Sequence, residues 1–137
     1  MLPEQVRKAE LAMMKVALRA MERGAMVSKP IFEGARYDYV IEDQGRLYRV
    51  QVKYGDGKLS RTVGTVQVNL RKQIKKQKNH PYCEDEVDAL AVYLPKLDKV
   101  CWFGPEVFCG KQCLAIRLLP TKSGRVKGCI AAEKHLW

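Results

Sequence analysis

Long apolar runs are absent from this chain of 137 residues. A helix that crosses a bilayer needs about 20 consecutive apolar residues, so the sequence excludes a protein anchored by such a helix. Arg7, Lys8 and Glu10 interrupt the place where a secretory signal carries its apolar core. Internal repeats, low-complexity stretches and linkers are absent as well. We therefore expect a cytoplasmic protein without a membrane partner, folded as one domain over residues 1–137.

Acidic residues are scarce: 15 Asp and Glu stand against 25 Lys and Arg, which gives a net charge of +10. The imbalance is concentrated between Arg46 and His80, where Asp56 is the only acid. A surface of this kind neutralises nucleic-acid phosphates and releases their counterions. The charge distribution favours a nucleic-acid partner over a basic surface that only contacts solvent.

A disulfide framework is also not expected, because the five cysteines are odd in number and no secretory signal precedes them. Four residues have a loose zinc-ligand spacing: His80, Cys83, Cys109 and Cys113. The alternative is that the cysteines serve as small apolar residues beside strands. The spacing favours this second interpretation.

The stretch from Arg36 to Tyr54 alternates polar and apolar residues on both sides of a turn, which predicts a β-hairpin. If Gln44 and Gly45 are the two central turn residues, Asp38 falls opposite Gln51. Lys53 then lies two residues further along the same face. The other face of the second strand is apolar or aromatic and should face the core: Tyr48, Val50, Val52 and Tyr54.

Other elements follow from apolar spacing. A helix is predicted from Pro3 to Arg23, with a buried stripe of Leu11, Met14, Ala17, Leu18 and Met21. Glu10 falls within that stripe, so it either pairs with a neighbouring base or points at a metal or lysine in a site. Strands are predicted over residues 25–28, 62–70, 87–94, 99–103 and 114–119, a loop or short helix over 71–79, and a short helix over 131–136. The fold class is therefore α/β, a mixed β-sheet flanked by helices.

Asp38, Gln51 and Lys53 suit metal-assisted hydrolysis of a phosphodiester. Mg²⁺ binds carboxylate oxygens and takes its remaining ligands from water and phosphate. The side-chain oxygen of Gln51 and the backbone carbonyl of Val52 add neutral oxygen ligands. Lys53 can orient the attacking water or stabilise charge on the phosphate. A solvated strand face that carries the same residues remains the alternative.

The order of a helix with an acid, then Asp38, then Q-x-K at Gln51 to Lys53 resembles the PD-(D/E)XK nuclease superfamily. Its small endonucleases associated with group I introns are similar in further motifs: G-x-x-V-S-x-P from Gly24, R-Y-D from Arg36, R-L-Y-R-V-Q-V-K from Arg46, Y-x-x-x-E-V-D-A-x-A-V-Y-x-P from Tyr82 and L-x-P-T-K from Leu118. The resemblance implies a restriction-endonuclease-like core and a homing endonuclease that cuts double-stranded DNA with Mg²⁺, or with Mn²⁺ as a substitute.

The resemblance also implies residue roles. Asp38 matches the metal-binding Asp, Gln51 the second acidic position and Lys53 the catalytic Lys. The helix acid of such families lies where this chain has Met13, so Glu10 is the substitute for both catalysis and metal binding. With one carboxylate fewer at Gln51, we expect weaker metal affinity than an acidic pair gives.

The resemblance implies that both strands are cut, which requires at least two subunits. It also implies assembly as in the tetrameric intron endonucleases of this group, so we expect a homo-oligomer, a dimer or tetramer. The interface candidates are Trp102, Phe103, Phe108 and Trp137, with core packing as the alternative for each and the favoured role for Trp102 and Phe103. The DNA-binding candidates are basic residues and amides that can bond adenine: Lys58, Arg61, Gln67, Asn69, Arg71, Lys72, Gln73, Lys75, Lys76 and Lys78. Three other readings stay open: a Holliday-junction resolvase, a non-catalytic DNA-binding module of the same fold, and a zinc-dependent DNA-binding protein.

Overall fold

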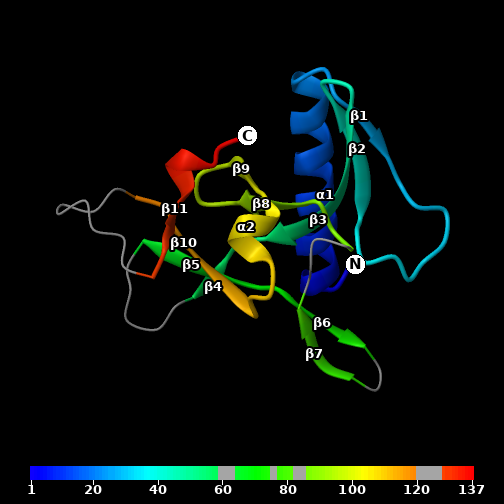
Figure 1. The fold of residues 1–137 in the computed structure, drawn as a ribbon. Coiled ribbons are helices and arrows are strands. Elements are labelled where there is room, and N and C mark those ends of the chain that lie inside the picture. The colour runs from blue at the N-terminus through cyan, green and yellow to red at the C-terminus, as the bar shows by residue number, and fades with distance from the viewer. Residues whose placement is uncertain (59–63, 75–76, 82–85, 120–127) are drawn as a thin grey trace.

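The computed structural model describes residues 1–58, 64–74, 77–81, 86–119 and 128–137. Two sheets and one long helix form the body, and a separate two-stranded ribbon projects from it (Figure 1). The elements are α1 (Glu4–Glu22), β1 (Met26–Ser28), β2 (Tyr39–Asp43), β3 (Arg46–Tyr54), β4 (Gly57–Lys58), β5 (Thr65–Asn69), β6 (Arg71–Ile74), β7 (Gln77–Pro81), β8 (Ala89–Leu94), β9 (Lys99–Phe103), α2 (Pro105–Phe108), β10 (Cys113–Arg117), β11 (Ile130–Ala131) and a 3₁₀ turn, η1 (Ala132–Lys134).

The first sheet has the order β1-β2-β3-β8-β9, with β3 and β8 parallel and the other pairs antiparallel. The second has the order β11-β10-β5-β4, and β6 pairs only with β7. The predicted mixed sheet and α/β class are confirmed. Within the described residues, no helix is both long and apolar enough to cross a membrane.

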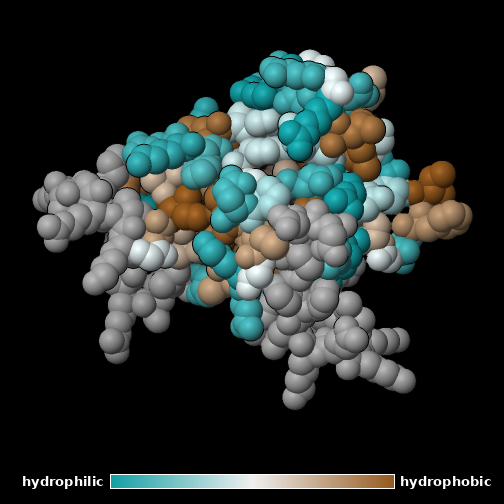
Figure 2. All heavy atoms as spheres, viewed as in Figure 1, coloured by the Kyte–Doolittle hydropathy of each residue, from teal (hydrophilic) through white to brown (hydrophobic). Residues whose placement is uncertain are grey.

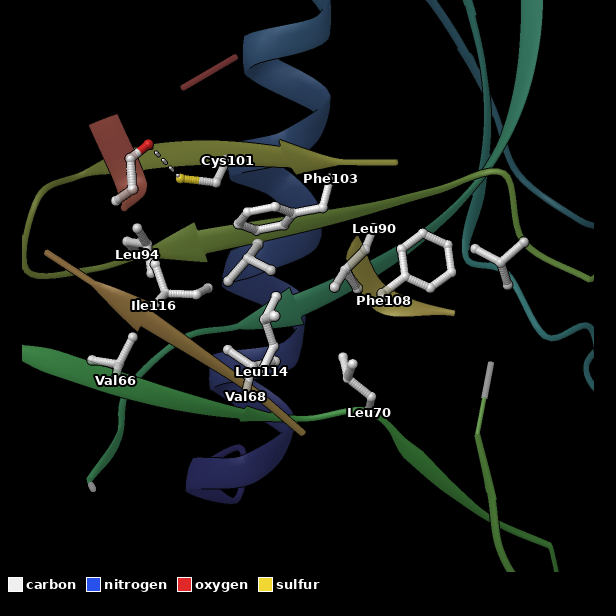
Figure 3. Close-up of a cluster of buried hydrophobic side chains, with 13 residues drawn as sticks. Val66, Val68, Leu70, Leu90, Leu94, Cys101, Phe103, Phe108, Leu114 and Ile116 are labelled. Carbon is white, nitrogen blue, oxygen red and sulfur yellow. Dashed lines mark hydrogen bonds between the residues drawn. The ribbon is translucent and has the colours of Figure 1, made fainter. Parts of the chain in front are cut away.

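Strand β8 is the centre of the fold, and all six of its residues are buried. Its alternate side chains belong to two different cores. Ala89 and Ala91 join the cluster under α1, whereas Leu90 and Val92 point into a cluster shared with the second sheet (Figure 3). The molecule is therefore layered as helix, first sheet and second sheet, and the continuous apolar run predicted for this strand is confirmed.

The predicted buried stripe of α1 is confirmed only for Leu11 and Ala17, which are partly buried and pack against the core under the helix. The buried residues are Ala12, Val16 and Ala20, while Met14 and Met21 are 69% and 70% exposed. Leu18 is also exposed. The small side chains of β8 beneath the helix explain the difference, because α1 lies close to the sheet through its own small residues and leaves its larger ones outside.

The hairpin register is confirmed. Tyr39 pairs with Val50 and Asp43 with Arg46, as expected when Gln44 and Gly45 form the turn. Both turn residues have positive φ, 53° and 78°, which is the conformation of a type I′ turn. Its twist matches that of the two strands, so the turn fixes which residues face each other across the hairpin.

Two further expectations are corrected. Residues 71–74 and 77–81 form the β6–β7 ribbon, where a loop or short helix was expected. Phe108 is fully buried in the cluster of Figure 3 and cannot form a subunit interface, and the core packing favoured for Phe103 is confirmed, since it is buried in the same cluster. Trp102 stacks on Trp137 with ring centroids 4.7 Å apart, which also favours packing within the chain. The short helix α2 was not expected; it begins at Pro105, a favoured first helical residue.

Candidate active site

A cavity of about 320 Å³ lies between the first half of α1 and the end of β3. Its lining includes all of the predicted hairpin residues, Asp38, Gln51, Val52 and Lys53. The hairpin register causes this meeting, because it places the residue before β2 opposite the second half of β3. The backbone N–H of Asp38 donates to the Val50 carbonyl at 2.8 Å, so the hydrogen bonding between the two strands extends to the residue before β2.

Asp38 is bonded directly to the strand that carries its partners. Its Oδ2 atom accepts a hydrogen bond from the backbone N–H of Val52 at 2.8 Å. This bond holds the carboxylate beside the peptide between Gln51 and Lys53. The Asp38 carboxylate and the Gln51 amide oxygen are hard oxygen ligands, and Lys53 places a positive charge next to them.

Two arginine–carboxylate pairs hold the ends of the hairpin strands against the segment before β8. Arg36 Nε lies 2.7 Å from Glu86 Oε2, and Arg49 donates to Asp88 through Nε at 2.9 Å and Nη2 at 3.1 Å. Each arginine precedes a site residue by two positions, Asp38 or Gln51. Arg49 holds the pKa of the Asp88 carboxyl below its usual value, chiefly through their side-chain hydrogen bond. The E-V-D-A motif therefore positions the hairpin.

Sequence reasoning missed three polar residues of the cavity: Gln5, Lys8 and Asp56. Lys8 Nζ lies 2.6 Å from Asp56 Oδ2 and 3.0 Å from Glu4 Oε1. The hydrogen bond to Asp56 first, and that to Glu4 second, raise the pKa of Lys8. Asp56 could have been noticed in the sequence, because it is the only acid of the basic stretch from Arg46 to His80. Lys8 could not, because the predicted buried stripe of the helix placed it away from the site.

The cavity balances its charges, with Lys8 and Lys53 against Asp38 and Asp56. A phosphate diester gains little from a neutral pocket, and a divalent cation tips the balance to positive. The oxygen donors of Asp38, Gln51 and Val52 fit such a cation, since Mg²⁺ needs only one or two carboxylates from protein. Among the described residues, no cluster of three or more His, Cys, Asp or Glu could hold a metal by itself.

Glu10 does not line this cavity, and its side chain is exposed on the outer face of α1. Its charge reaches the site indirectly: burial raises the pKa of Tyr39, and the carboxylates of Glu10 and Asp38 add to the effect. The Tyr39 hydroxyl donates to the Met13 carbonyl at 3.1 Å. The structure therefore brings together every predicted site residue of the hairpin, whereas the helix acid is near Tyr39 but not among the residues that line the cavity.

The predicted DNA-binding residues are divided between the second sheet and the ribbon. Gln67 and Asn69 are exposed on β5. Lys58 is on β4, and four others lie on the ribbon strands: Arg71, Lys72, Gln73 and Lys78. Arg61, Lys75 and Lys76 lie outside the described residues. Cys83 does as well, so the structure does not test the zinc hypothesis. Cys109 and Cys113 are exposed.

Comparison with known proteins identifies the fold and the family. The solved structure of a bacterial homing endonuclease, I-Ssp6803I, shares the fold with a TM-score of 0.76 at 24% sequence identity, covering 98% of this chain and 89% of the other. No curated protein sequence matches. A model of the PD-(D/E)XK endonuclease family matches residues 4–136, and nucleases of this family generally use divalent metal ions. The chain therefore belongs to the PD-(D/E)XK endonuclease family, with DNA as the expected substrate of its nuclease activity.

Proposed function

We propose that the protein is a metal-dependent, sequence-specific endonuclease that cuts double-stranded DNA, of the homing type. The observation that carries this proposal is the convergence of Asp38, Gln51 and Lys53 on one cavity. The family supplies the reaction class, phosphodiester hydrolysis. The structural likeness to a homing endonuclease supports the narrower type, because almost the whole of each chain is covered.

Each residue of the site has a distinct role in this proposal. Asp38, the Gln51 side-chain oxygen and the Val52 carbonyl hold Mg²⁺, or Mn²⁺ as a substitute. The bound cation supplies Lewis acidity and draws the phosphate into an otherwise neutral cavity. Lys53 orients the attacking water and stabilises the negative charge that grows on the phosphate oxygens. Glu10 is exposed and does not line the cavity, but its charge acts on Tyr39 beside Asp38, so we keep it as the candidate helix acid for metal binding and catalysis.

The β6–β7 ribbon supports the double-stranded substrate. A two-stranded β-ribbon fits the major groove of B-DNA, where each base pair presents a distinct pattern of donors and acceptors. The ribbon projects from the body (Figure 1), and its strands carry basic residues and amides: Arg71, Lys72, Gln73 and Lys78. We propose that these residues contact DNA, together with Lys58, Gln67 and Asn69 of the second sheet.

We further propose that the active form is a homo-oligomer, since one site cuts one strand. The outer face of α1 supports this. It exposes Val6, Met14, Leu18 and Met21 along one side of the helix. Apolar side chains in such a row are typical of a surface that another subunit covers. This face replaces the aromatic candidates, which pack within the chain.

The test begins with a randomised duplex library, cut by the wild-type protein in Mg²⁺ and sequenced at the new ends. A recurring cut sequence is expected. Lys53→Ala should reduce the single-turnover rate on that sequence by about 100-fold or more. Lys96→Ala removes the same charge from an exposed turn and should leave the rate unchanged.

Other outcomes would replace the proposal. Cutting of four-way junctions without a sequence preference would indicate a resolvase. Binding of duplex without cutting, in both Mg²⁺ and Mn²⁺, would indicate a DNA-binding module. Equal loss of rate in Lys53→Ala and Lys96→Ala would show that the charge, and not the position of Lys53, matters.

A further inference from the structure

The loop between β1 and β2 presents two large apolar side chains to solvent. Ile31 is 92% exposed and Phe32 is 84% exposed. The loop extends well beyond the strands that it joins (Figure 1), and apolar side chains project from the surface at the same place (Figure 2). Neither side chain stabilises the fold of this chain, because neither is buried in it. Their exposure therefore indicates a partner.

The base of this loop is anchored at the proposed active site. Residues 29–35, Tyr37 and Asp38 line one cavity of about 420 Å³, so the loop and the metal-binding carboxylate share a wall. The Arg36–Glu86 ion pair, 2.7 Å long and largely buried, fixes the chain just before Asp38. The Ile31–Phe32 tip thus extends from a fixed base, next to the place where the proposed metal site at Asp38 would bind the DNA phosphate.

Two partners fit an apolar tip: a second copy of the chain, or the stacked bases of DNA. The position favours DNA. A subunit bound to the tip would also cover the loop cavity, which shares Asp38 with the active-site cavity. The DNA backbone must reach Asp38 from this side. Lys29 and Glu33 both line the same cavity, and Lys29 on the loop can contact a DNA phosphate beside the tip. An exposed Phe next to an exposed Ile is the kind of side-chain pair that inserts between base steps and unstacks them.

We propose that the Ile31–Phe32 tip is a wedge that enters the DNA at a base step beside the scissile phosphate and unstacks it. This inference rests on the proposed endonuclease function, and it adds a residue pair that determines which sequences are cut. Pyrimidine–purine steps unstack most easily. A wedge therefore favours such a step next to the cut, even though the side chains make no hydrogen bond to a base.

The experiment uses the cut sequence obtained from the library, with 2-aminopurine placed singly at each step around the cut. Lys53→Ala protein should bind this duplex and raise the fluorescence at one step. The double variant Lys53→Ala, Phe32→Ala should bind without that rise. With the catalytic lysine intact, Phe32→Ala should cut about 5- to 150-fold more slowly, the range of base–aromatic stacking. Leu47→Ala, an exposed apolar residue at the other end of β3, is the matched control and should change neither readout.

A mismatch at the fluorescent step gives the decisive comparison. A duplex that is already unstacked needs no wedge, so Phe32→Ala should recover most of its rate on the mismatched substrate. Wild-type cutting without any fluorescence change would overturn the wedge while the nuclease function stands. Sedimentation showing that Phe32→Ala loses a subunit contact would overturn it in favour of a second copy. Failure of the wild type to cut any library member would overturn the function, and the wedge with it.

Discussion

Replacing Asp38 by asparagine and by alanine separates its structural role from its chemical one. The Oδ2 atom accepts the Val52 N–H at 2.8 Å. Asparagine keeps an oxygen acceptor of the same shape but loses the charge, whereas alanine removes both. We expect both variants to lose about 1,000-fold in cutting rate, since metal polarisation contributes several kcal/mol to such reactions.

The stabilities should differ between the two variants. A hydrogen bond to a charged group contributes about 1.5–3 kcal/mol and one between neutral groups about 1 kcal/mol, so Asp38→Asn should cost about 1 kcal/mol. Asp38→Ala leaves the N–H of buried Val52 without this acceptor, at a cost of about 2 kcal/mol. For a chain of 137 residues, each kcal/mol lowers the melting temperature by roughly 3–4 °C.

Thermal unfolding followed by circular dichroism, first in EDTA and then in Mg²⁺, measures both effects. Mg²⁺ should raise the melting temperature of the wild type and of neither variant, because a ligand that binds only the folded state stabilises it. Cutting by Asp38→Asn at within tenfold of the wild-type rate would refute the metal role. Equal melting temperatures of the two variants in EDTA would refute the structural role of the bond to Val52.

Three further predictions concern the scaffold. Arg49 lowers the pKa of the Asp88 carboxyl, so the stabilising effect of this carboxylate is present above its unfolded pKa and is lost as the pH falls through its folded pKa. Asp88→Asn should therefore lower the free energy of unfolding in urea by about 1 kcal/mol at pH 7, a small value because the Arg49 and Asp88 side chains are 35% and 32% exposed. The same substitution should have no effect on stability once the pH lies well below about 4. Ala91→Leu should push α1 off the sheet and cost about 1–3 kcal/mol in the same assay, and an unchanged midpoint would contradict the close packing. Burial raises the pKa of the Cys101 thiol to about 11, so iodoacetamide at pH 8 should label exposed Cys109 in the native protein and spare Cys101, as mass spectrometry can show.

The hairpin and β8 were predictable because their information is local. A two-residue turn at Gln44 and Gly45 fixes the pairing of the strands that follow it, and pairing alone brings Asp38 opposite Gln51. The unbroken apolar run of β8 requires burial on both faces, whichever elements supply the cover. The basic charge and the Q-x-K spacing likewise indicated nuclease chemistry without any tertiary contact.

Tertiary structure decided what local pattern leaves open. α1 has two apolar faces, one of small residues around Ala12 and one of larger residues around Met14, and packing against the first sheet, mainly against β3 and β8, selects the small one. That choice turns Glu10 outward and Lys8 toward Asp56, because all residues of a helix rotate together. The composition of residues 71–81 is polar on both faces, so periodicity cannot identify the ribbon. The sequence by itself thus determined the hairpin and the meeting of Asp38, Gln51 and Lys53 on it, while packing of α1 against the first sheet determined which helix residues accompany them.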